Sequence, residues 1–238
     1  MREYDIPIEW ENLIKNKELA RVVGDITGDG HLQLSGRRGI ASFYSKHMEE
    51  IKRENNRFMK LFGIKGHVYT DNRKTVRYKL MIPSKRLAIF LESIGVPVGN
   101  KTNKEFSVPD WILKGCEEIK SSYLRGIFTS EACISLTKKR WRIHIEQYKS
   151  VKLEKAGIQF MLHICQMLKD FGIITSPIRT GKGNIRRDGT KSIRMQLDIE
   201  KRYFNKFYKY IGFDNKVKNE KLRIAMRENK RGLEHNLL

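Results

Sequence analysis

An internal repeat limits what this chain can fold into more than any other feature of its 238 residues. The segment 20–30, ARVVGDITGDG, aligns with the segment 122–132, SYLRGIFTSEA. Both place a small residue at every fourth position and carry an acid, Asp29 or Glu131, as their next-to-last residue. Side chains four residues apart lie on one face of a helix. Each segment therefore predicts a helix with one face of small residues and a carboxylate at its C-terminal end.

The repeat continues along the chain in the same order. Further matches pair 61–64 with 170–173, 93–96 with 210–213, and Asn100-Lys101 with Asn215-Lys216. One such match can arise by chance, but four in the same order indicate a duplicated unit. We therefore predict two structural copies that differ in the length of their loops.

Hydrophobic periodicity within each copy alternates between helical and extended. It predicts an α+β fold made of two αββαββα lobes, each with an antiparallel sheet. In the first copy we expect strands at 31–35, 40–45, 67–70 and 75–82, and helices at 47–62 and 84–94. In the second copy we expect strands near 133–137, 141–148, 175–180 and 191–198, and helices at 151–171 and 201–211. The predicted domains are a lobe at 1–98, a linker at 99–111 and a lobe at 112–238.

The net charge points to a polyanionic partner. Lys and Arg number 48 against 27 Asp and Glu, which gives a formal charge of +21. A hydrophobic fraction of 39% argues against disorder and for a folded core. The chain has neither a long apolar run nor a signal or transit peptide at its start, so we expect an intracellular, cytoplasmic protein that binds nucleic acid and no membrane.

Helices with a small-residue face can approach each other closely. We therefore expect the two repeated helices to pack about a pseudo-twofold axis and to bring Asp29 and Glu131 together. Two adjacent carboxylates repel each other, so a cation is needed between them. Hard oxygen ligands favour Mg²⁺, and Ca²⁺ or Mn²⁺ can occupy the same kind of site. The simpler interpretation is that Gly28 only ends a helix and Asp29-Gly30 form a turn.

The two repeated segments resemble the paired motifs of the monomeric LAGLIDADG homing endonucleases. Residues 108–112, VPDWI, also resemble the segment that connects the motifs in that family, and the resemblance extends from Leu19 to Lys218. Two residues depart from the family pattern, because Glu131 replaces an aspartate and Ala132 replaces the terminal glycine of the second motif. We expect Glu131 to bind metal equally well, and Ala132 to require a different backbone turn.

The resemblance implies a monomeric endonuclease, with no obligate protein partner, that cuts both strands of a long asymmetric DNA site and leaves short 3′ overhangs. It implies that the sheets form a DNA-binding saddle on either side of the two central motif helices. It assigns Asp29 and Glu131 to metal binding and catalysis, and gives the backbone carbonyls of Gly28 and Ser130 a lesser role as metal ligands.

Two symmetric pairs of lysines are candidates for assisting the reaction or binding DNA. Lys101 and Lys216 follow the last helix of each copy, and we predict that they take part in catalysis. Lys46 and Lys149 follow or end the second strand of each copy, and we predict that they contact DNA.

The strands alternate between basic or polar residues and apolar ones, as expected of a sheet with one face exposed. Such a face can enter the major groove and carry side chains to base edges. In the first copy the predicted DNA-binding residues, besides Lys46, are His31, Gln33, Ser35, Arg37, Arg38, Arg73, Thr75, Arg77 and Lys79. In the second copy they are Arg140, Arg142, His144, Arg186, Arg187, Ser192, Arg194 and Gln196, besides Lys149.

Two other functions stay open on sequence grounds. One is an RNA-binding intron maturase on the same scaffold, and the other is a catalytically inactive DNA-binding regulator. The acid retained in each motif argues against the inactive regulator, which needs neither.

Overall fold

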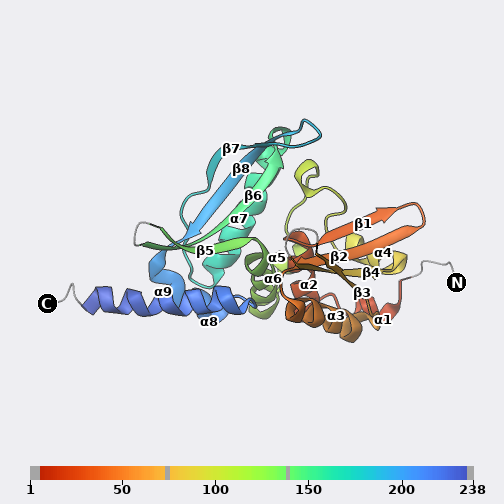
Figure 1. Ribbon diagram of the computed structural model, residues 1–238, viewed down its shortest axis with the longest axis horizontal. Helices are drawn as coiled ribbons and strands as arrows, with labels where there is room; N and C mark the ends of the chain where they lie inside the picture. The colour runs from red at the N-terminus through yellow and green to blue at the C-terminus, as the bar shows by residue number, and fades with distance from the viewer. Residues whose placement is uncertain (1–5, 73–75, 138–139, 235–238) are drawn as a thin grey trace. The chain divides into compact units, whose positions relative to one another are not determined.

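The computed structural model describes residues 6–72, 76–137 and 140–234, with side chains up to residue 228. The chain divides into two compact units. Unit 1 comprises Met1–Lys104 and Pro109–Tyr123, and unit 2 comprises Glu105–Val108 and Leu124–Leu238. Each unit contains a four-stranded antiparallel sheet, which confirms the predicted α+β class (Figure 1). The chain passes from unit 1 to unit 2 for the last time between Tyr123 and Leu124, inside the second repeated segment.

Unit 1 follows the predicted order of helices and strands closely. Its sheet has the strand order β1-β2-β4-β3. The elements are α1 (Ile8–Glu11), α2 (Lys17–Thr27), β1 (His31–Ser35), β2 (Arg38–Ser45), α3 (Met48–Phe62), β3 (His67–Asp71), β4 (Arg77–Pro83), α4 (Lys85–Ser93), the 3-10 turn η1 (Lys101–Asn103) and α5 (Asp110–Leu113). The helix α6 (Glu117–Glu131) begins in this unit and ends in the other.

Unit 2 repeats the topology with the strand order β5-β6-β8-β7. Its elements are β5 (Ala132–Thr137), β6 (Arg140–Ser150), η2 (Val151–Leu153), α7 (Glu154–Asp170), β7 (Arg179–Ile185), β8 (Lys191–Ile199), η3 (Lys201–Tyr203), α8 (Phe204–Tyr210) and α9 (Lys216–Glu234). Helix α9 lies beyond the last predicted helix, which spans 201–211.

The core of unit 1 lies between one face of its sheet and the helices α3 and α4. Strand alternation turns Leu32, Leu80 and Ile82 into this core, where each is fully buried. Gly39 lets α4 come close to β2, because a Cβ there would lie 2.6 Å from the Lys85 Cα atom. Ser84 caps α4, since the Leu87 amide donates to the Ser84 hydroxyl at 3.2 Å.

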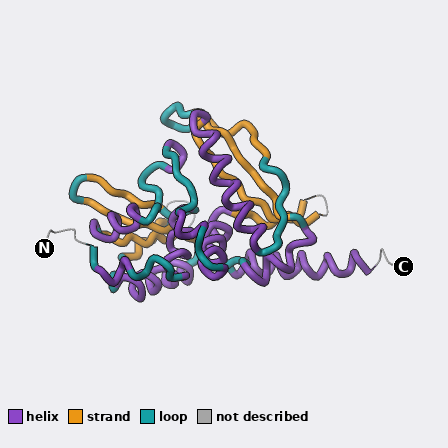
Figure 2. The backbone as a smooth tube through the Cα atoms, turned by 180° about the vertical axis from the view of Figure 1, so that it is seen from behind, coloured by secondary structure: helices purple, strands orange, loops and turns teal. Residues whose placement is uncertain are grey.

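The core of unit 2 lies between its sheet and α7, which crosses β6 and β8 (Figure 2). A second apolar cluster joins the end of α6 to α8. There the Phe128 and Phe207 rings lie 5.1 Å apart, and Phe207 and Phe213 lie 5.2 Å apart. These contacts fix the end of the second repeated helix by aromatic packing.

In the described part of the chain, no helix is both long enough and apolar enough to span a membrane.

Candidate active site

The first repeated helix ends as the sequence predicts, with an exposed acid in the following turn. Helix α2 stops at Thr27, Gly28 caps it, and Asp29 is exposed in the turn before β1. Gly30 makes this tight turn possible, because a Cβ there would lie 2.6 Å from the Ile26 Cα atom. The simple glycine-and-turn description therefore applies locally, and the turn presents a carboxylate to solvent.

The second repeated helix ends differently. Helix α6 continues through Glu131, and β5 begins directly at Ala132, without the intervening turn. Ala132 is buried, so its methyl group packs where the first copy has a glycine turn. This confirms that Ala132 requires another backbone path, and it places Glu131, which is exposed, on the last residue of the helix.

A lysine binds the carbonyl groups at the end of α2. The Lys101 ammonium donates to the carbonyls of Ile26 and Thr27, both at 3.0 Å, to that of Gly28, and to that of Gly30 at 2.9 Å. The chain reaches this position because the Gly99 amide donates to the Leu32 carbonyl at 2.8 Å, which holds the segment beside β1. A cation here offsets the negative end of the helix dipole next to Asp29.

In unit 2 the equivalent lysine is Lys218, and the predicted equivalence of Lys216 is wrong. The Lys218 ammonium donates to the carbonyls of Thr129 at 2.6 Å and Ser130 at 3.3 Å, next to Glu131. Lys216 is exposed at the first residue of α9.

The matched asparagines explain the shift. Asn100 caps a 3-10 turn of three residues, and its side chain accepts from the Thr102 amide at 3.1 Å. Asn215 instead caps a long helix by accepting from the Lys218 amide at 2.9 Å. In a helix, the amide of the third residue after the cap lies next to the cap side chain. Lys218 is the third residue after Asn215, so Lys218, rather than Lys216, lies beside this cap. The sequence signal for this difference was Asn215, an asparagine at the start of a helical pattern.

The carboxylates of Asp29 and Glu131 are hard oxygen ligands, the kind that Mg²⁺-like cations prefer. No cluster of three or more acidic, histidine or cysteine side chains that could hold a metal occurs among the described residues. The carbonyls of Gly28 and Ser130, predicted as lesser ligands, already accept hydrogen bonds from Lys101 and Lys218. Each unit thus offers one exposed carboxylate, and Mg²⁺-like ions commonly combine one or two carboxylates with phosphate and water.

The first residue of β1 lies within the field of two lysines. Burial, together with the positive charges of Lys101 and Lys79, lowers the pKa of His31. His31 is therefore held neutral more strongly than an ordinary histidine, and its imidazole can donate and accept hydrogen bonds near Asp29.

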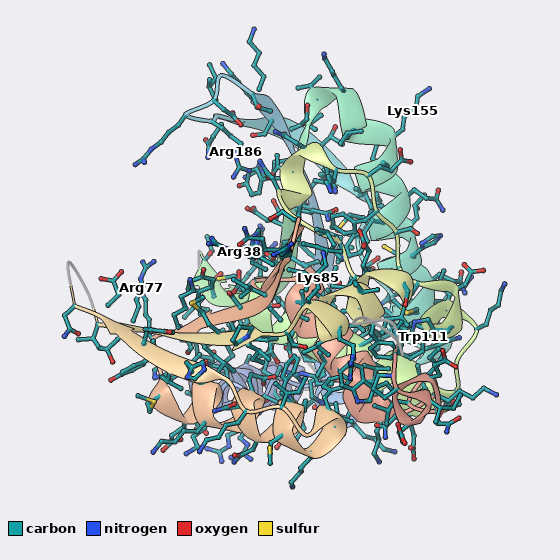
Figure 3. The ribbon with its side chains drawn as sticks, turned by 90° about the vertical axis from the view of Figure 1, so that its right-hand side faces the viewer. Arg38, Arg77, Lys85, Trp111, Lys155 and Arg186 are labelled. Atoms are coloured by element: carbon teal, nitrogen blue, oxygen red, sulfur yellow. The ribbon has the colours of Figure 1, made fainter. Side chains whose placement is uncertain are left out.

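The exposed face of the first sheet is basic and polar, as predicted. Among the described residues that we predicted to bind DNA in the first copy, His31 and Lys79 are half-buried and all the others are exposed. Figure 3 shows Arg38 and Arg77 on the strands of this sheet. Arg73 and Thr75 lie outside the described residues.

The equivalent face of the second sheet carries acids that the prediction missed. Glu146 accepts from Tyr148 at 2.9 Å and from Arg194 at 3.4 Å. Asp198 accepts from Gln196 at 3.1 Å and from Arg179 at 2.5 Å. The alternation that selected Arg142 and His144 also places Glu146 on this face, so the signal was present in the sequence.

Two residues predicted to bind DNA are buried. Lys149 is fully buried, and its ammonium lies 3.5 Å from the centre of the Phe106 ring. It shares the inward parity of Ile143 and Ile145, so alternation itself contradicts its assignment to the DNA face. Ser192 is also buried. Its hydroxyl accepts from the backbone amide of Asn184 at 2.9 Å and donates to the backbone carbonyl of Asn184 at 2.7 Å.

The remaining candidates of the second sheet lie where the sequence places them. Arg140 and Arg142 are exposed on β6, and His144 is half-buried on the same face. Arg186 and Arg187 are exposed between β7 and β8, where Figure 3 labels Arg186.

Residues 16–95 match the family model described as "LAGLIDADG-like domain". The chain is 31% identical to "tRNA-splicing ligase RtcB" of Pyrococcus furiosus over 95% of its own length and 26% of that protein. It is 29% identical to "DNA-directed RNA polymerase subunit Rpo1N" of Methanocaldococcus jannaschii, over 91% of its own length and 17% of that protein. The chain thus spans about a quarter or less of these curated relatives.

Solved structures of homing endonucleases share the fold. I-DmoI in complex with DNA and Ca matches with a TM-score of 0.54 and 16% identity, over 83% of this chain and 90% of I-DmoI. A variant of I-DmoI was solved with its target DNA and Mn. The homing endonuclease I-WcaI bound to its DNA recognition sequence matches with a TM-score of 0.54 and 13% identity, over 87% of this chain and 85% of I-WcaI. Residues 16–95 of this chain therefore match the LAGLIDADG-like domain, and the chain has the fold of the homing endonucleases I-DmoI and I-WcaI.

Proposed function

We propose that this protein is a monomeric, site-specific endonuclease that cuts both strands of double-stranded DNA with the help of a divalent cation such as Mg²⁺. The observation that carries this proposal is the repeated arrangement of an exposed acid beside a lysine that binds helix-end carbonyls. Asp29 with Lys101 forms it in unit 1, and Glu131 with Lys218 forms it in unit 2. One such arrangement per unit is what an enzyme needs to cut two strands.

Each residue of this arrangement has a role that follows from its position. Asp29 and Glu131 are the acids that would hold the cation, and both side chains are exposed, so a cation bound there could also contact a phosphate. A bound divalent cation would activate water and stabilise the leaving oxygen. Lys101 and Lys218 add fixed positive charge beside each acid, which offsets the helix dipole and the charge of the phosphodiester.

The basic strands would hold the DNA. Arg38 and Arg77 are exposed on the first sheet, and Arg140 and Arg142 are exposed on the second. Such side chains can reach base edges in the major groove and phosphates beside it. The acids Glu146 and Asp198 accept hydrogen bonds from Arg194 and Arg179 in the second sheet, so we propose that the first sheet contributes more to non-specific affinity.

The relatives support a transferable domain rather than a ligase or a polymerase. A splicing ligase and a polymerase subunit have unrelated activities, yet both contain a segment similar to this chain. The segment makes up 26% of the first and 17% of the second. A segment that recurs in unrelated proteins is expected of a mobile genetic element. An enzyme that cuts a specific DNA site can spread such an element to new sites.

A selection from randomised duplex DNA tests the proposal. The protein is incubated with the library and Mg²⁺, and the ends that it produces are sequenced. We expect one long asymmetric site cut on both strands, with short 3′ overhangs, and no cutting when EDTA removes the metal. Absence of double-strand cleavage, together with tight binding to structured RNA, would favour the maturase instead.

A further inference from the structure

A cavity beside β2, β3 and β4 of the first sheet is lined by aromatic and charged side chains. Its volume is about 910 Å³, which is within the range of small-molecule sites. Three tyrosines, from three different strands, line it together with groups that can donate and accept hydrogen bonds. The lining residues are Tyr44, Tyr69, Thr70, Asp71, Asn72, Arg77, Tyr78 and Lys79.

Strand register places two of the tyrosines on either side of a lysine. Tyr44 on β2 and Tyr69 on β3 are both paired with Lys79 on β4, which lies between them. The tyrosines are 50% and 52% exposed, and the Lys79 ammonium lies 5.5 Å from the centre of the Tyr44 ring. We call these three residues the tyrosine row. It offers exposed aromatic surface next to a positive charge.

The tyrosine row lies at the end of the sheet that holds the acid of unit 1. His31, the first residue of β1, pairs with Ser42, and Tyr44 lies two residues further along β2. The charge of Lys79 acts on His31 together with that of Lys101, so these side chains are close to one another. The row is therefore near the turn that carries Asp29.

In an intact duplex, the ring faces of these tyrosines have no free base face to stack on. Within a duplex each base face is covered by its neighbours, and the grooves present only base edges and phosphates. An unpaired base has a free face, and it stacks on tyrosine or phenylalanine while a nearby lysine contacts the backbone. Exposed rings on both sides of a lysine thus match an unpaired nucleotide.

We propose that the tyrosine row binds an unstacked base of single-stranded DNA, next to the phosphate that unit 1 cuts. The inference deepens the proposed function, because staggered cleavage would leave unpaired nucleotides beside Asp29. Stacking such a base would retain the cut end on the enzyme.

Binding of oligo(dT) and of a blunt duplex, each measured by fluorescence anisotropy at one salt concentration with EDTA, tests this proposal. Tyr69→Leu removes the aromatic ring, whereas Tyr69→Phe keeps it. We expect Tyr69→Leu to weaken oligo(dT) binding about tenfold and duplex binding by less than about twofold. Tyr69→Phe should change neither by more than about twofold. Tyr208→Leu, at an exposed tyrosine on α8, is the control for surface aromatics.

Two results would overturn the assignment. Equal loss of duplex and oligo(dT) affinity in Tyr69→Leu would make the row an ordinary part of the duplex-reading surface. A strong preference for oligo(rU) over oligo(dT), lost in the same variant, would assign the row to RNA. Because the assay contains no metal and involves no cutting, its failure is separate from a failure of the nuclease proposal.

Discussion

The two units build the same sheet topology, but they hold their repeated helices by different chemistry. In unit 1, Arg57 on α3 binds Glu18 and Asp25 on α2 at 2.9 and 3.5 Å. These contacts adjoin the pair Arg21–Asp25 within α2, at 2.7 Å, and the pair Arg57–Glu54 within α3, at 2.6 Å. In unit 2, the end of α6 is held by the packing of Phe128, Phe207 and Phe213. The shared strand order therefore does not depend on either kind of contact.

The C-terminal ends of the two repeated helices also differ in backbone and agree in chemistry. Asp29 lies in a glycine turn and Glu131 on the last residue of a helix, yet each acid is exposed beside a lysine that binds carbonyl groups. The lysine comes from a 3-10 turn in one unit and from a long helix in the other. What the two copies keep in common is the chemistry at the helix end, while the backbone that delivers it differs.

The ionic network of unit 1 should give the largest difference in stability between the units. Arg57→Met would leave Glu54 and Asp25 buried without the guanidinium that joins them. We expect it to lower the free energy of unfolding by about 4 kcal/mol, measured by denaturant titration. Phe207→Leu in unit 2 nearly conserves apolar volume, so we expect a loss of about 1 kcal/mol there. A stable Arg57→Met variant would show that the network contributes nothing beyond packing.

The two lysines at the helix ends should matter for cleavage in both units. We expect Lys101→Met and Lys218→Met each to lower the single-turnover cleavage rate about 100-fold, as loss of one preorganised donor does. Lys101 binds more carbonyls than Lys218, so its loss should be the larger. Lys216→Met is the matched control and should cut within about twofold of the wild type. A defect in Lys216→Met with normal cleavage in Lys218→Met would restore the pairing read from the sequence.

The same network makes the stability of unit 1 depend on pH. Burial and the charge of Asp25, opposed by Arg57 and Arg21, raise the pKa of Glu54 from 4.5 to about 7. Because the pKa is higher in the folded state, the stabilisation is present below 4.5 and is lost as the pH rises through about 7.

We expect the free energy of unfolding to fall by about 3 kcal/mol over that range, and Glu54→Gln to remove most of the slope. Thermal or denaturant unfolding at a series of pH values measures it. An unchanged slope in Glu54→Gln would show that another group titrates there.

The smallest expected effect is a difference in the salt dependence of DNA binding between two lysines that occupy matching positions in the repeat. Lys46 is exposed, whereas Lys149 is fully buried against Phe106. Lys46→Ala should reduce the slope of log affinity for DNA against log salt by about one, because one phosphate contact is lost. Lys149→Met should leave the slope unchanged, and an equal reduction in both variants would contradict the structural assignment of Lys149.

Local patterns predicted the topology well. The alternation of Leu32, Leu80 and Ile82 with polar neighbours found the strands, and Ser84 marked the start of α4. The predictions were wrong where residues were chosen by matching the two copies rather than by the pattern of their own strand or helix. Lys149 was paired with Lys46 although its own strand turns it inward, and Lys216 was chosen because Asn215-Lys216 matches Asn100-Lys101.

The rest depends on long-range contacts that no local pattern contains. The buried ions joining α2 to α3 link Arg57 to Glu18 and Asp25, which are far apart in the sequence. How the two motif helices lie against each other, and with them Asp29 and Glu131, stays a prediction.

The rate at which Asp29→Asn and Glu131→Gln cut the selected DNA site tests the central claim most directly. Each substitution removes one carboxylate and nearly preserves side-chain volume, so folding and DNA contacts should persist. We expect double-strand cleavage to be abolished in both variants, while affinity for the site stays within about tenfold of the wild type. Cleavage at the normal rate by either variant would contradict the role that we assign to that acid.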